Sequence, residues 1–161
     1  WNTVDYAVDD WSRTISEPIA QAIEISPKRH APIRVTQQLP VVDIIPVSPG
    51  KVIFDFGQNM VGVPRFSLPV IAGQEVTVRY AEALHLGEFY TDNYRSAKSM
   101  NRIIPSVSGT MQYEPTFTYH GYRYIEISGF DETKAPRKSW ARAQIQHSDV
   151  KLHATFTSSH P

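Results

Sequence analysis

The sequence contains no cysteine, no long apolar run and no excess of charge of either sign. Without cysteine, the chain has no disulfide and no thiolate ligand for a metal. Sixteen basic and sixteen acidic residues leave a formal net charge of zero, whereas proteins that bind nucleic acids need a basic surface for the phosphate backbone. No stretch approaches the ~20 apolar residues of a membrane-spanning helix. These absences argue against nucleic-acid and membrane partners.

Catalytic and metal-binding motifs are also missing. The sequence has no HExxH pair, no GxSxG elbow and no glycine-rich phosphate loop. Calcium bound by Asp9, Asp10 or Asp92 with backbone carbonyls stays open as a minor alternative, although no EF-hand spacing is present. We therefore expect no catalytic residue, no metal site and no cofactor in this chain.

Short segments rich in Val, Ile, Tyr, Phe and Thr alternate with twelve prolines and eight glycines. This pattern is typical of strands joined by turns. We expect strands at 33–37, 41–45, 51–56, 61–68, 74–80, 101–104, 111–118, 122–128, 140–147 and 152–156. Their number and spacing predict an all-β chain folded as an antiparallel jelly-roll sandwich.

Three local features refine this prediction. Pro64 interrupts one predicted strand, so we expect a sheet edge or a bulge there. Residues 17–25 are the best candidate for a helix, with Pro18 fitting only its first turn. The polar segment 85–99 shows no periodicity but contains Phe89, Tyr90 and Tyr94, so we expect an ordered loop packed on the sheet.

Four segments resemble the bacterial α-L-rhamnosidase family of glycoside hydrolases. They are FDFGQNMVG at 54–62, RYAEAL at 79–84, YTDNYRSA at 90–97 and YEPTFTYHGYRYIE at 113–126. They occur in the order and spacing of that family, and the likeness continues upstream at 29–35 and downstream at 146–149 and 154–158. Four co-linear motifs are more specific than any single short pattern. The resemblance implies a concanavalin-like β-sandwich domain.

The same resemblance implies a domain organisation. Residues 1–30 are expected to be the tail of a preceding β module and a linker, 31–150 the concanavalin-like domain, and 151–161 the start of a connection to a helical catalytic domain. The sequence begins with Trp1 instead of Met, which favours a fragment of a longer polypeptide. The expected partner is therefore an (α/α) barrel catalytic domain of the same polypeptide.

Enzymes of this family remove terminal α-L-rhamnose with inversion, which needs two widely spaced carboxyl groups. In the family these carboxyl groups lie on the barrel, so this chain alone is expected to be inactive. The expected role is a scaffold for the barrel, with rhamnose-containing glycosides bound by the full enzyme. An autonomous carbohydrate-binding module and a purely structural spacer remain alternatives.

Six residues are candidate contacts for substrate or for a neighbouring domain. They are Asn59, Asp92, Asn93, Arg95, Tyr119 and His120. The first belongs to a polar group with Asp55 and Gln58 that could bind sugar hydroxyls. We favour a structural interpretation, in which these side chains close a turn on the backbone.

Two further groups allow both a functional and a structural interpretation. Glu82, Asp92 and Arg95 could be an acid/base pair with a cation, but we favour an arginine clamp that ties the 85–99 loop to the sheet. The aromatic cluster at 119–124 could stack on sugar rings, but strand aromatics more often fill a core or a domain interface. Gly121 predicts a bulge or a kink that redirects His120.

Overall fold

A computed structural model describes residues 4–18, 24–151 and 153–159, and the chain divides into two units, Trp1–His30 and Ala31–Pro161. The described residues of the first unit form turns and extended chain without a helix or strand. Within it, the rings of Tyr6 and Trp11 meet edge to face with centroids 6.0 Å apart. Most of the helix expected at 17–25 lies outside the described residues, and 17–18 and 24–25 are not helical.

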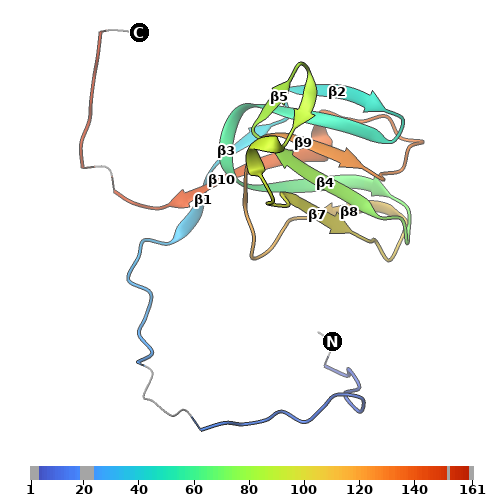
Figure 1. Cartoon of the computed structure of the whole chain (residues 1–161), viewed down its shortest axis with the longest axis vertical. Helices are drawn as coiled ribbons and strands as arrows, with labels where there is room; N and C mark the ends of the chain where they lie inside the picture. Colours follow the sequence, from blue (N-terminus) through green and yellow to red (C-terminus); the bar gives the residue numbers. More distant parts are fainter. Residues whose placement is uncertain (1–3, 19–23, 152, 160–161) are drawn as a thin grey trace. The chain divides into compact units, whose positions relative to one another are not determined.

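The second unit is a β-sandwich (Figure 1). Its strands are β1 (Ile33–Pro40), β2 (Asp43–Ser48), β3 (Lys51–Val70), β4 (Val76–Ala81), β5 (Ala83–His85), β6 (Glu88–Tyr90), β7 (Met100–Ile103), β8 (Gly109–Tyr113), β9 (His120–Ser128) and β10 (Ala141–Ser148). Two short 3₁₀ turns, η1 (Asp92–Tyr94) and η2 (Lys138–Trp140), precede β7 and β10. No helix in the described part of the chain is long and apolar enough to cross a membrane.

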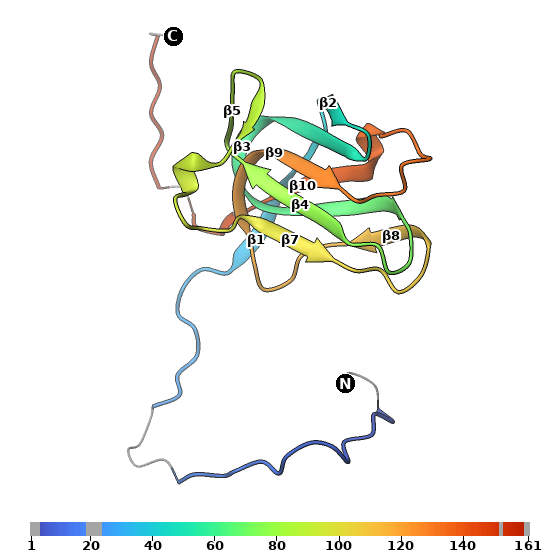
Figure 2. The same cartoon turned by 45° about the vertical axis from the view of Figure 1, so that its right-hand side comes forward.

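The long strand β3 belongs to both layers of the sandwich. Its first part pairs with β2 and β9, and its second part pairs with β10 and then β8. Figures 1 and 2 show the strand curling from one layer into the other. Every pairing is antiparallel, and the main sheet runs β1-β10-β3-β9-β4-β7. The predicted all-β antiparallel sandwich is confirmed.

The core lies between the layers and follows the two-residue period of the strands. In β4, Val76, Val78 and Tyr80 are fully buried, whereas Thr77 and Arg79 lie on the outer face and are only partly buried. Inward side chains of β3 and β9 complete the core, among them Phe54 and Ile125. A smaller apolar cluster forms on the outer face, where the β5–β6 hairpin packs over the sheet.

Pro64 shows how β3 accommodates a residue without a backbone N–H. It pairs with Ala143 of β10 on one side. On the other side, pairing with β9 ends at Gly62 and pairing with β8 begins at Phe66. Pro64 therefore lies at a local edge between two partner strands, where the missing donor breaks no ladder, and the expectation of an edge is confirmed.

Several predicted boundaries are wrong. Segments 51–56 and 61–68 are one strand, because the residues between them form a bulge and do not leave the sheet. The strand expected at 111–118 ends at Tyr113, just before Glu114 and the ladder-breaking Pro115. The segment 85–99, expected to be a loop, overlaps a β-hairpin formed by β5 and β6, and this hairpin starts at Ala83. Residues 153–156 form no strand, and Leu152 lies outside the described residues.

Candidate functional site

A bulge in β3 places Asp55 against Arg123. The ladder between β3 and β9 is regular up to the pair Asp55–Tyr124 and resumes at Met60–Tyr122, so four residues of β3 lie opposite one of β9. Asp55 Oδ1 accepts hydrogen bonds from the Gly57 N–H (2.6 Å) and from Arg123 Nε (2.8 Å), and Oδ2 accepts one from Arg123 Nη2 (2.8 Å). Asp55 therefore closes a turn, as the structural interpretation expected.

The two amides of the bulge behave differently from Asp55. Gln58 and Asn59 are exposed, and neither side chain makes a hydrogen bond to another described residue. Gly57 has φ +75°, a conformation that other residues adopt at a cost. The bulge thus presents two free amides to solvent above a fixed carboxylate–guanidinium pair, and Asn59 stays a candidate contact.

We expect Asp55→Asn to lower the free energy of unfolding by about 1–2 kcal/mol at pH 7, a value reduced for the partial exposure of Arg123. The Arg123 guanidinium holds the pKa of Asp55 below its ordinary value, with the Gly57 N–H adding to this effect and burial opposing it. A lowered pKa means that the stabilisation is complete above the unfolded pKa near pH 4 and is lost as the pH falls through the folded pKa.

Urea unfolding at pH 7 and at pH 3 tests this expectation, because the difference between wild type and Asp55→Asn should shrink in acid. Glu75→Gln is the control, since Glu75 pairs with an Arg102 side chain that is 66% exposed and should therefore contribute less to stability. A difference that stays constant over this pH range would contradict the role given to the Asp55 carboxylate.

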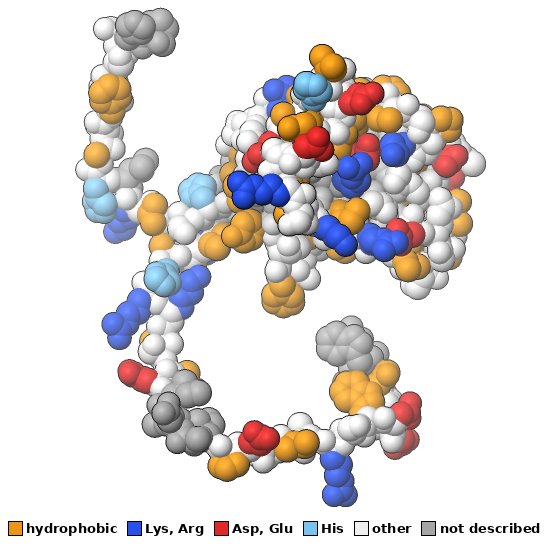
Figure 3. Space-filling model, viewed as in Figure 1, with side chains coloured by type: hydrophobic (Ala, Val, Ile, Leu, Met, Phe, Trp, Pro, Cys, Tyr) orange, Lys and Arg blue, Asp and Glu red, His pale blue; other side chains and the backbone are white. Residues whose placement is uncertain are grey.

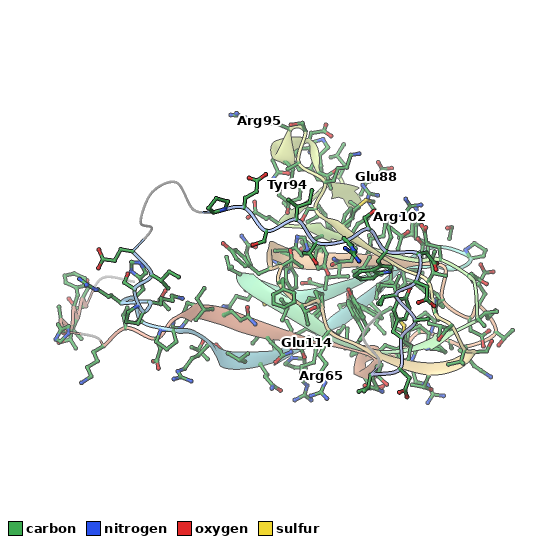
Figure 4. All side chains as sticks on the ribbon, turned by 90° about the horizontal axis from the view of Figure 1, so that it is seen from below. Arg65, Glu88, Tyr94, Arg95, Arg102 and Glu114 are labelled. Carbon is green, nitrogen blue, oxygen red and sulfur yellow. The ribbon has the colours of Figure 1, made fainter. Side chains whose placement is uncertain are left out.

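The η1 loop is held by hydrogen bonds that do not involve its arginine. Asn93 Nδ2 donates to Glu82 Oε2 (3.2 Å), and the Tyr94 hydroxyl donates to the Gly121 carbonyl (3.2 Å). Arg95 is exposed and extends outward from the loop (Figure 4). It makes no ion pair within the described ranges. The predicted arginine clamp is therefore wrong: an amide and a phenol tie this loop to the sheet.

His120 is a half-buried residue at the start of β9. Its ring stacks on Tyr80 with centroids 3.9 Å apart and an interplanar angle of 14°. Nδ1 lies 3.1 Å from Ser99 Oγ, and Nε2 is buried without a partner among the described residues. Burial lowers the pKa of His120, so its imidazole is neutral at physiological pH.

The aromatic cluster at 119–124 divides between core and surface. Tyr122 is fully buried, Tyr124 lies beneath the Arg123 guanidinium, and Tyr119 is 62% exposed. Of the bulge or kink expected at Gly121, the bulge is wrong, because Gly121 pairs regularly with Val61 and the irregularity lies opposite Arg123. Gly121 instead allows close approach, since a Cβ there would lie 3.2 Å from Glu82 Oε1.

The structure brings only some of the six candidate residues together. Asn93 binds Glu82, which follows β4, and the next residue, Tyr94, binds Gly121, the neighbour of His120 in β9. Asp92 and Arg95 flank Asn93 and Tyr94 on the same loop. Tyr119 lines a separate hollow of about 190 Å³, to which none of the other five contributes. Asn59 lies on the β3 bulge. The six are thus spread over one end of the sandwich.

A second group of charged residues escaped the sequence reasoning. A hollow of about 380 Å³ on the outer face includes Arg79, Glu88 and Glu126. Arg79 Nη1 lies 2.9 Å from Glu126 Oε1 and its guanidinium covers the Phe89 ring at 5.1 Å, while Lys51 Nζ is 3.8 Å from the same oxygen. The sequence did place Arg79 on the outer face of its strand, which could have indicated this group. Its partner Glu126 could not be found in that way, because the pairing depends on the register between β4 and β9.

Residues 45–147 match the family described as the bacterial alpha-L-rhamnosidase concanavalin-like domain. The match covers well over half of the chain. The chain belongs to this family.

Relatives extend the match over the whole chain. An alpha-L-rhamnosidase of Alteromonas sp. (strain LOR) is 51% identical over 100% of this chain, and one of Formosa agariphila is 40% identical over 99% of it. The solved Streptomyces avermitilis alpha-L-rhamnosidase complexed with L-rhamnose has a TM-score of 0.69 and 36% identity over 74% of this chain. The chain spans 18%, 17% and 12% of these three proteins.

These comparisons confirm the resemblance inferred from the four motifs. They also establish that this concanavalin-like domain is a small part of the related proteins. Within the described residues, no group of three or more His, Cys, Asp or Glu side chains is placed to hold a metal ion.

Proposed function

We propose that this domain is a non-catalytic scaffold in an enzyme that removes terminal α-L-rhamnose from glycosides. The observation that carries the proposal is the engagement of its buried carboxylates. A glycosidase needs a carboxylic acid with a raised pKa to protonate the leaving group. Arg123 lowers the pKa of Asp55 instead, and Glu126 lies between Arg79 and Lys51. Both carboxylates thus have structural partners.

The proposed partner is an (α/α) barrel catalytic domain of the same polypeptide. Its contact would involve the end of the sandwich that carries Asn59, the η1 loop and Tyr119. Arg95 and Tyr119 are exposed there, and arginine and tyrosine are enriched at protein interfaces. Asn93 and Tyr94 hold the loop on the sheet, so it can present Asp92 and Arg95 in a fixed position.

We expect the purified 161-residue chain to release no nitrophenol from p-nitrophenyl α-L-rhamnoside. The full-length Alteromonas relative, assayed alongside, is the positive control. The physical reason is that the two buried carboxylates of the described residues, Asp55 and Glu126, are paired with cations instead of being set up as acid and base. Hydrolysis by the purified chain that persists after a second chromatographic step would overturn the proposal.

An autonomous carbohydrate-binding module is the second candidate, because exposed Tyr119 borders a hollow with Ile33, Val61 and His147. Aromatic rings bind the apolar faces of sugars. Calorimetric titration with rhamnose separates the two proposals. A scaffold predicts no heat of binding at millimolar sugar, whereas a saturable signal that Tyr119→Ala removes would favour the module.

A further inference from the structure

A groove lined by cations crosses the outer face of the layer built from β1, β10, β3 and β8. It consists of two hollows, of about 490 and 430 Å³, that share Ser67 and Ser139. Five cationic side chains line it: Arg65, Lys134, Arg137, Lys138 and Arg142. No acidic side chain of the described residues lines either hollow. The groove differs from the face shown in Figure 3, where acidic and basic side chains are interspersed.

Two arginines in the groove lie directly opposite one another. Arg65 of β3 and Arg142 of β10 are cross-strand partners, so their side chains leave the same face of the sheet. Like charges in this arrangement are destabilising. Both arginines nevertheless line the same hollow, and no acidic side chain of the described residues lines it with them. A bound anion would reduce the repulsion between the two guanidinium groups.

The donors of this pair are largely unused. The Arg65 side chain is exposed and makes no hydrogen bond or ion pair with another described residue. Arg142 Nη1 lies 3.5 Å from Gln38 Oε1, at the limit of a hydrogen bond. By contrast, four other arginines of the sandwich each pair with a carboxylate: Arg34, Arg79, Arg102 and Arg123.

Neutral polar groups surround the cations. The first hollow is also lined by Gln38, Ser67, Gln112 and Ser139, with Gln112 Nε2 donating to Ser67 Oγ at 2.7 Å. Amides and hydroxyls can each donate and accept hydrogen bonds, which suits the hydroxyl groups of a sugar. Each hollow lies in the size range of small-ligand sites. Because the two hollows adjoin at Ser67 and Ser139, together they have room for two consecutive sugar units of an oligosaccharide.

We propose that this groove binds an acidic oligosaccharide, with a carboxylate or sulfate group between Arg65 and Arg142. Guanidinium groups bind such oxyanions through charge-assisted, often bidentate, hydrogen bonds. A concave lining of amides and hydroxyls favours a saccharide over an acidic protein surface. The inference goes beyond the proposed scaffold role and does not depend on it.

The groove is separate from the candidate residues described above. Figure 4 shows Arg65 and Glu114 on one outer side of the sandwich and Arg95 on the opposite side. Glu114 follows β8 on the groove side, but it lines neither hollow, and the described chain contains no ion pair between it and Arg65. A ligand bound in the groove would therefore not contact the η1 loop.

Calorimetric titration of the 161-residue chain with trigalacturonate at low salt tests the proposal. We expect saturable binding that weakens with ionic strength, because the contacts are exposed to solvent. Arg65→Gln and Arg142→Gln are each expected to weaken binding about tenfold, the loss of a charge-assisted hydrogen bond. Lys98→Gln removes the same charge outside the groove and should leave binding unchanged.

Thermal unfolding without ligand gives a second measurement, in which the same substitution is expected to raise stability although it weakens binding. Because Arg65 and Arg142 repel one another, Arg65→Gln should raise the melting temperature by about 1–3 °C while it weakens binding. If Arg65→Gln instead lowers the melting temperature, its loss of binding would be due to damaged folding. That result would also contradict the repulsion between Arg65 and Arg142 on which the inference rests.

Other outcomes of the titration decide against the groove. Equal binding of trigalacturonate by wild type and Arg65→Gln would overturn the proposal, as would equal binding of neutral galactotriose. Tighter binding of hexaglutamate than of trigalacturonate would also overturn it and identify an acidic protein segment as the partner of this face.

Discussion

Replacing Gly62 with alanine is expected to destabilise the domain by about 3 kcal/mol or more, at the upper end of overpacking costs. Gly62 lies in β3, between Ile145 of β10 and His120 of β9. A Cβ at this position would lie 1.9 Å from the backbone carbonyl oxygen of Gln144. Backbone cannot rotate away as a side chain does, so β3 and β10 would have to separate.

The sign of this effect is the informative part. In a strand without a positive φ, replacing glycine with alanine normally stabilises, because the unfolded chain loses conformational freedom. Gly121→Ala is the matched control, since Gly121 lies in the neighbouring strand β9 and its Cβ would meet only the end of the exposed Glu82 side chain, at 3.2 Å. Urea denaturation of both variants measures the difference. Equal stability of Gly62→Ala and Gly121→Ala would contradict the close approach of β3 and β10.

Tyr80→Ala is expected to cost about 4 kcal/mol, as for other large-to-small aromatic changes in a core. Tyr80 is fully buried, stacks on His120 and lies with its ring centroid 5.3 Å from that of Tyr122. Its hydroxyl donates to Asn101 Oδ1 at 2.6 Å. Burial raises the pKa of this hydroxyl, so it stays protonated and remains a donor. One side chain therefore connects β4 with β7 and β9.

Tyr80→Phe separates the two contributions of this residue. It keeps the ring and removes one hydrogen bond, so we expect a loss of about 1–2 kcal/mol. Tyr119→Ala, at a position 62% exposed, should change stability much less. Chemical denaturation gives these values, and hydrogen exchange at Ser99 and His120 should increase in Tyr80→Ala because the stacked ring no longer supports them. A Tyr80→Ala domain as stable as Tyr80→Phe would show that the ring does not hold this part of the core.

Much of the domain was predictable because strand alternation and motif order are local properties. Val76, Val78 and Tyr80 were expected on one face of their strand, and the structure buries all three. The same alternation left Arg79 on the outer face, but it did not reveal Glu126, which is 47 residues away in the sequence. The turn-closing role of Asp55 was also foreseen, since Asp accepts hydrogen bonds from the residues that follow it.

The errors share a non-local cause. Glu82, Asp92 and Arg95 are complementary in charge and close in sequence, yet Glu82 accepts from Asn93 and Arg95 faces solvent. Backbone geometry at η1, where Arg95 has φ 56°, decides which side chain can reach the sheet. Similarly, the irregularity expected at Gly121 lies opposite Arg123, because the extra residues belong to β3 and not to β9.

The amino-acid sequence by itself determined an all-β chain, its strand-forming segments and its membership of the rhamnosidase concanavalin-like family. Only the tertiary structure decided that β3 serves both layers, that Asp55 meets Arg123 and that Arg65 lies opposite Arg142. The physical reason is that side-chain alternation has a period of two residues and can be seen within one strand. Register is set between strands, and a shift of one residue sends every side chain to the other face.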